Sequence, residues 1–211
     1  MITAKRGTAR EPVPAGTFPA RCYKIMHLGT SWDERLQKMQ NKIRLDWELP
    51  TETKIFDHEK GEQPLSISKD YTLSMNEKSN LCKDLESWKG KKFTDPEAEA
   101  FDITSVLGND CLINIAHKVS NSSGNVYAYV ASVVPMPKGM ECPPPVNPPF
   151  IWDFDEHFDE SILEGLHEFF QGKIKSSEEY KAKMDPIEVQ EAPDPGYDDI
   201  PPEVGEDGLP F

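Results

Sequence analysis

Alternating apolar and polar positions predict five β-strands in the first two thirds of the chain. The clearest run covers residues 41–49, where four apolar residues from Ile43 to Leu49 alternate with charged ones. A period of two residues is typical of a strand with one buried and one solvated face. The predicted strands are 17–28, 41–49, 65–73, 111–119 and 125–134, with the turn 120–124 joining the last two as a hairpin.

The first of these strands has an irregular pattern. Cys22 is expected on one face, with Arg21, Tyr23 and Ile25 on the opposite face, and Lys24 interrupts the alternation. Pro50 is expected to end the second strand, because proline cannot donate a hydrogen bond to a neighbouring strand.

Helical spacing follows the third strand. Ser74 with Glu77 three residues later forms a capping box, which predicts a helix start. Gly90 is placed to end this helix, and residues 91–110 are read as a connector with a short helical turn after Asp102. The apolar stripe of the helix consists of Leu81, Leu85 and Trp88.

The order of three strands, one helix and two strands is that of an OB-fold, a partly open Greek-key barrel that often binds oligonucleotides. The expected fold is therefore mainly β: a five-stranded OB-fold-like barrel with a helix between strands 3 and 4, plus a C-terminal helix and a disordered acidic tail. The predicted divisions are a flexible arm 1–15, an OB-fold domain 16–142, a Pro-rich linker and amphipathic helix 143–184 with its helix at about 159–174, and a disordered tail 185–211.

Charge separates the chain into two unlike parts. The 211 residues carry a net charge of −14, but residues 1–149 contain 19 basic and 19 acidic residues, whereas residues 150–211 contain 4 and 18. Residues 185–211 hold nine acidic residues, six prolines and no basic residue. Such a segment buries too little apolar surface to offset the entropy of ordering. A neutral folded body with an acidic interaction tail is therefore expected.

The cysteines and the amino terminus bear on the compartment. Cys22, Cys82, Cys111 and Cys142 form no CxxC pair, so we interpret them as reduced thiols. No segment has the pattern of a signal peptide or the roughly 18 apolar residues of a membrane span. A cytoplasmic protein without membrane contact is expected.

Candidate binding residues come from the predicted strands and from the loop between strands 1 and 2. Single-strand binding requires Lys or Arg along the phosphates and aromatic rings beneath the bases. Trp47, Tyr71 and Trp88 share rows with aliphatic residues, which favours a core position. The candidate single-strand contacts are Arg21, Tyr23, Trp32, Arg35, Lys38, Lys42, Arg44, Lys118, Tyr127 and Tyr129.

The chain ends in Asp207-Gly208-Leu209-Pro210-Phe211. This tip resembles that of bacterial single-stranded DNA-binding proteins, in which an acidic run ends in Ile-Pro-Phe and recruits replication and repair partners. The resemblance implies a partner-binding role for Asp207, Leu209, Pro210 and Phe211.

Residues 17–135 also resemble small phage proteins of replication or recombination modules. The strings that carry this resemblance are Leu28-Gly29-Thr30, Trp47-Glu48-Leu49-Pro50, Tyr71-Thr72-Leu73-Ser74, Glu77-Lys78-Ser79-Asn80-Leu81 and Leu85-Glu86-Ser87-Trp88-Lys89-Gly90.

The expected function is single-stranded DNA binding and protection in phage DNA replication or recombination, with partner recruitment through the tip. Nucleotide-binding and hydrolase motifs are absent from the sequence, so no enzymatic step, cofactor or metal is expected. The alternative is a protein-interaction adaptor whose helix and acidic tail bind host or phage proteins without DNA contact. A nuclease or metal enzyme is a distant third possibility. The oligomeric state stays open.

Overall fold

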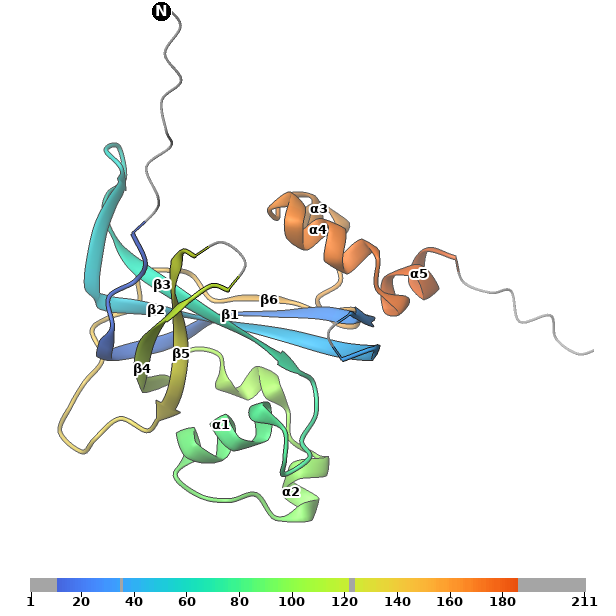
Figure 1. Cartoon of the computed structure of the whole chain (residues 1–211), viewed down its shortest axis with the longest axis horizontal. Coiled ribbons are helices and arrows are strands. Elements are labelled where there is room, and N and C mark those ends of the chain that lie inside the picture. Colours follow the sequence, from blue (N-terminus) through green and yellow to red (C-terminus); the bar gives the residue numbers. More distant parts are fainter. Residues whose placement is uncertain (1–10, 35, 122–123, 186–211) are drawn as a thin grey trace, which may run out of the picture.

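The computed structural model describes residues 11–34, 36–121 and 124–185. A curled antiparallel sheet forms a half-barrel, with one group of helices below it and a second group beside it (Figure 1). The elements are β1 (Gly16–Asp33), β2 (Lys38–Asp57), β3 (Gly61–Thr72), α1 (Asn80–Lys89), α2 (Asp95–Glu99), the 3-10 helix η1 (Ile103–Val106), β4 (Asp110–Val119), β5 (Val126–Val134), β6 (Phe150–Trp152), α3 (Glu160–Glu164), α4 (Glu168–Lys175) and α5 (Glu178–Met184).

The five predicted strands are present, and a sixth, β6, was not predicted. The sheet order is β3-β2-β1-β4-β5, and β6 pairs with β1 in parallel. β3 and β5 therefore end the antiparallel path, and they approach one another without being hydrogen-bonded neighbours. We call the opening between them the seam.

β1 and β2 are longer than predicted. β1 continues to Asp33, and β2 already begins at Lys38. Trp32 and Lys38 therefore lie within strands and not in a loop. The predicted end of the strand at Pro50 is also wrong, since β2 runs on to Asp57. The pairing of β2 with β1 ends at Glu48. Pro50 lies beyond this point, so its lack of a backbone N–H group removes no hydrogen bond between β1 and β2.

A bulge in β1 explains the irregular pattern around Lys24. The register of β1 with β2 shifts between Cys22 and Lys24. Because of this extra residue, Cys22 and Ile25 point into the same hydrophobic cluster, and the predicted placement of Ile25 opposite Cys22 is wrong. Met26 then points into a second cluster on the other face.

The first cluster fills the inside of the curled sheet, and apolar residues of α1 pack into it. It contains Trp47, Tyr71 and Trp88, which confirms their core positions. α1 begins at the N-cap Ser79 and not at Ser74, because the Ser79 hydroxyl accepts a hydrogen bond from the backbone N–H of Cys82.

The end of α1 and one of the two short helices in the connector that follows it were predicted. Gly90 ends α1 in the left-handed conformation with a φ of 69°, as predicted. The short turn after Asp102 is confirmed as η1, whereas α2 was not predicted.

The C-terminal helices surround the second cluster on the outer face of β1. The helix predicted at about 159–174 is two helices, because the chain breaks at Gly165 and His167 caps α4. Met26 of β1 packs there with Trp152 of β6 and Ile174 of α4. α5 continues this group but was not predicted.

Two predicted segments fall wholly or mainly outside the described residues. These are the first ten residues of the arm and the tail from residue 186 onward, which includes the tip residues Asp207, Leu209, Pro210 and Phe211. Within the described part of the chain, every helix is too short or too polar to cross a membrane.

Candidate functional site

Three of the predicted strand cations are engaged in ion pairs, and Arg21 and Lys42 are two of them. Arg21 lies directly opposite both Asp110 of β4 and Glu48 of β2 in the sheet register. Its guanidinium is 2.7 Å from Asp110 and 3.7 Å from Glu48. Lys42 lies 2.6 Å from Asp33. A phosphate would have to compete with these carboxylates.

Arg44 is also paired, and it is covered from outside. It lies opposite Asp70 of β3, at 2.7 Å, and 2.9 Å from Asp46, and it also donates to the Ser68 hydroxyl. The Phe170 ring of α4 sits over its guanidinium, 4.9 Å from the ring centre. This arrangement stabilises the packing of α4 on β2.

Tyr23 lies in the bulge of β1 and is half-buried. Burial raises the pKa of its hydroxyl, the carboxylate of Asp46 raises it further, and a hydrogen bond with Ser66 opposes the rise. The ring is therefore a packed and hydrogen-bonded group on the outer face of the sheet, not an open stacking platform.

The β1–β2 hairpin exposes Trp32. Its side chain is 55% exposed and lies opposite Met39 across the hairpin. Lys38, at the start of β2, is exposed as well. Trp32 borders a cleft of about 540 Å³, which we call the Trp32 cleft and which also contains Lys42. Arg35 lies outside the described residues.

The β4–β5 hairpin brings three predicted residues onto one face. Lys118 lies directly opposite Tyr127, and Tyr129 follows two residues later on the same side. All three side chains are exposed. The alternate row, which includes Val130, points to the core, as the period of two requires.

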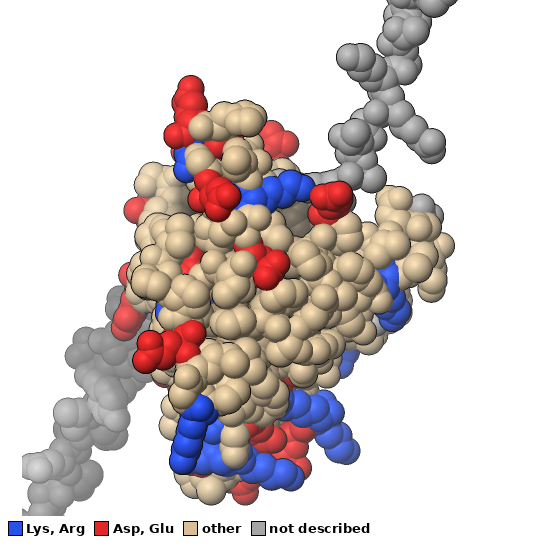
Figure 2. Space-filling model, turned by 90° about the vertical axis from the view of Figure 1, so that its left-hand side faces the viewer, with Lys and Arg blue, Asp and Glu red and all other residues tan. Residues whose placement is uncertain are grey.

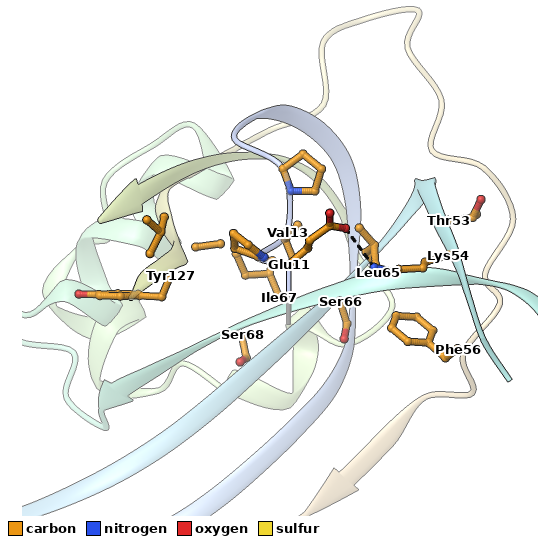
Figure 3. A pocket seen from close by; sticks show the side chains of 14 residues that line it. Glu11, Val13, Thr53, Lys54, Phe56, Leu65, Ser66, Ile67, Ser68 and Tyr127 are labelled. Atoms are coloured by element: carbon orange, nitrogen blue, oxygen red, sulfur yellow. Dashed lines mark hydrogen bonds and ion pairs between the residues drawn. The ribbon is translucent and has the colours of Figure 1, made fainter. Parts of the chain in front are cut away.

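A second cleft, of about 630 Å³, lies at the seam (Figure 3). β2, β3, β5 and the segment that precedes β1 all contribute to it. Tyr127 and Phe56 lie toward opposite ends of this seam cleft, and they are 45% and 50% exposed. The cleft thus offers aromatic surface from two strands that are distant in sequence.

The segment before β1 forms one wall of the seam cleft. The Nε2 atom of His117 is 2.8 Å from the carbonyl oxygen of Val13, which fixes this segment against β4. Glu11 pairs with Lys54 at 3.3 Å, and both side chains are well exposed. Exposed pairs of this kind contribute little free energy, so an incoming anion could take the place of Glu11 at small cost.

Charged side chains are unevenly spread on the side of the molecule that carries the β2–β3 hairpin. Figure 2 shows a broad surface with few charges, Lys and Arg gathered at the end where α1 and α2 lie, and Asp and Glu scattered above. Among the described residues, this face has no continuous basic groove. Binding at this face would rest more on rings than on phosphate contacts.

Sequence reasoning missed three residues at these clefts: Phe56, Lys173 and Lys181. Phe56 lies beyond Pro50, where the strand was expected to have ended. The lysines belong to helices whose position on β1 depends on long-range packing. No group of three His, Cys, Asp or Glu side chains suited to a metal ion occurs among the described residues.

Comparison with known proteins adds no identity. No protein-family model matches the chain, and no curated protein matches it.

Proposed function

We propose that this protein has an OB-type fold and binds single-stranded DNA. The order β3-β2-β1-β4-β5, with the two ends approaching at the seam and α1 placed between β3 and β4, supports an open barrel of this type. Such barrels commonly hold extended strands of nucleic acid.

The observation that carries the proposal is the pair of exposed rings at the seam cleft. Tyr127 and Phe56 present aromatic surface from β5 and β2, and Lys54 lies at the Phe56 end of the cleft. Bases stack on such rings irrespective of sequence, because every base has a π-face. Lys54 can exchange Glu11 for a phosphate, and Lys118 lies next to Tyr127 on the hairpin.

The proposal extends to a role in phage DNA replication or recombination. The bound strand would be protected in the cytoplasm of a bacterial host, and the tip ending in Phe211 would recruit replication or recombination proteins. The segment 207–211 supports this part of the proposal through its acidic residue, its apolar Leu209 and the ring of Phe211.

One observation favours the alternative, a protein-interaction adaptor. Arg21, Lys42 and Arg44 all have carboxylate partners within the described fold. An adaptor would use the helices and the acidic tail and would leave the seam cleft without DNA.

Alanine substitution in the seam cleft separates these functions. Binding of a fluorescently labelled dT oligonucleotide is measured by anisotropy for the wild type and for Tyr127→Ala and Phe56→Ala. Each variant should bind at least about fivefold more weakly, since a stacked ring is worth about 1–3 kcal/mol per base.

Ile55→Ala is the matched control for Phe56→Ala. Ile55 neighbours Phe56 on β2 and is equally exposed, at 50%, but it does not border the cleft. Its substitution should leave the affinity unchanged. Wild-type affinity in both ring variants would contradict a strand bound at the seam.

A further inference from the structure

The Trp32 cleft is lined by residues of the charge-neutral body and by residues of the acidic C-terminal part of the chain. One wall is the β1–β2 hairpin with Trp32 and Lys42, and the other consists of α4 and α5 with Lys173 and Lys181. Residues 150–211 contain only four basic residues, all on α4 and α5. Two of these four therefore border the same cleft as the exposed indole.

Specific contacts hold α5 in this position. Ser177, the N-cap of α5, is fully buried against Gly29 of β1. Glu179 accepts hydrogen bonds from the backbone N–H and the hydroxyl of Thr30, both at 2.6 Å. These bonds lower the pKa of the Glu179 carboxyl although partial burial acts to raise it. The lysines are thus carried on helices that are fixed to the hairpin.

The lysines that line the cleft differ in how closely each is paired with a carboxylate, and this decides which of them can bind a phosphate. Lys173 is 3.4 Å from Asp70, a loose pair in which both side chains are about one-third exposed. Lys42 is closely paired with Asp33, and Glu178 also borders the cleft. Lys181 is exposed. Lys173 and Lys181 are consequently the two cations best placed to take a phosphate.

We propose that α4 and α5 complete a second nucleotide-binding site, in which a base stacks on Trp32 and the adjoining phosphates contact Lys173 and Lys181. This inference rests on the proposed function. An exposed ring flanked by lysines suits the alternation of bases and phosphates in a single strand. The C-terminal helices then belong to the nucleic-acid interface.

Trp32 provides a direct probe of this site. The other three tryptophans are buried, at 0%, 8% and 0% exposure. Addition of a dT oligonucleotide to the full-length protein should therefore quench tryptophan fluorescence through Trp32. The Trp32→Phe variant should lose this response, and Trp32→Ala should bind at least about fivefold more weakly.

The lysines are tested through salt dependence. The slope of log K against log salt for a single strand falls by about 0.7 for each phosphate contact that is lost. Lys173→Gln and Lys181→Gln should each reduce the steepness by about this amount. Lys175→Gln is the matched control, since Lys175 is exposed on α4 but does not border the cleft.

The outcomes distinguish this inference from the proposed function. If the wild-type protein does not bind dT, both the proposed function and the second nucleotide-binding site are wrong. Binding that is weakened by Tyr127→Ala, with no quenching at Trp32 and wild-type salt slopes in the lysine variants, would overturn only the second site.

Discussion

At the scale of single residues, Gly29 marks a close approach between the sheet and the C-terminal helices. Its φ is +75°, and an added Cβ would lie 2.5 Å from the Cβ of Ser177. Gly61 has a similar φ of +70°, but nothing lies within 4 Å of the position of its Cβ. The two glycines therefore share the backbone constraint and differ in packing.

Alanine at these glycines should separate the two effects. Gly61→Ala should lower the free energy of unfolding by about 1–2 kcal/mol, the cost of a left-handed L-residue. Gly29→Ala should cost at least about 1 kcal/mol more, because α5 must also shift. Urea unfolding of both variants measures the difference, and equal losses would contradict the docking of α5 on β1.

Cys142 reports on the packing of the segment that follows β5. Partial burial, with Asp110 nearby, raises the pKa of its thiol from 9.0 to about 11. At pH 8 the fraction of Cys142 present as thiolate is then about one hundredth of the fraction for a thiol of pKa 9.0. A more basic thiolate is also a better nucleophile, which recovers about a factor of ten in the reaction rate.

Cys142 should therefore react with Ellman's reagent about tenfold more slowly in the folded protein than in urea. Cys22, Cys82 and Cys111 are buried and should react only on unfolding. A thiol that reacts rapidly at pH 8 before unfolding would show that Cys142 is not packed as described.

At the scale of elements, the Pro-rich segment after β5 is held by a buried carboxylate. Glu48 of β2 is fully buried and accepts hydrogen bonds from the backbone N–H groups of Val146 and Asn147, at 3.3 and 2.9 Å, and from the side-chain amide of Asn147 at 2.8 Å. This segment leads to β6 and then to the C-terminal helices.

Glu48→Gln should lower the free energy of unfolding by about 1.5–3 kcal/mol, the range for hydrogen bonds to a charged group. The backbone amides of Val146 and Asn147 should also exchange their hydrogens faster. Glu59→Gln, at an exposed turn, serves as the control and should change neither quantity. Unchanged exchange in Glu48→Gln would mean that the carboxylate does not hold this segment.

Elements that form through interactions between residues close in sequence could be predicted, whereas elements that depend on distant residues could not. The strands could be predicted because alternation is local, and Gly90 could be placed because its αL conformation is local too. β6 has three residues and exists only through its parallel pairing with β1. The break between α3 and α4 lies at Gly165 and His167, and the helical period of the apolar residues alone does not indicate it.

The same division applies to the candidate site. Trp32, Tyr127 and Tyr129 were candidate contacts, and all three are exposed, although alternation alone does not show which row of β5 faces outward. The pairing of Arg21 and Arg44 depends on which carboxylates lie opposite them in the sheet, and the local alternation does not fix that register. Local pattern therefore identifies candidate cations but cannot show which of them are already neutralised.

At the scale of the whole molecule, two clefts lie on one curled sheet. The seam cleft draws on β2, β3 and β5, and the Trp32 cleft draws on β1, β2 and the C-terminal helices. Because many cations of the body are paired, binding should depend on ring stacking, with a moderate number of phosphate contacts. Salt should weaken binding, but less steeply than in a protein with a continuous basic groove.

The most direct measurement is fluorescence anisotropy of a labelled dT oligonucleotide titrated with the full-length protein at low and moderate salt, with a matched duplex as the control. The account predicts binding to the single strand that weakens with salt, together with much weaker binding to the duplex. Equal affinity for both forms, or no binding even at low salt, would contradict single-strand recognition and favour the adaptor function.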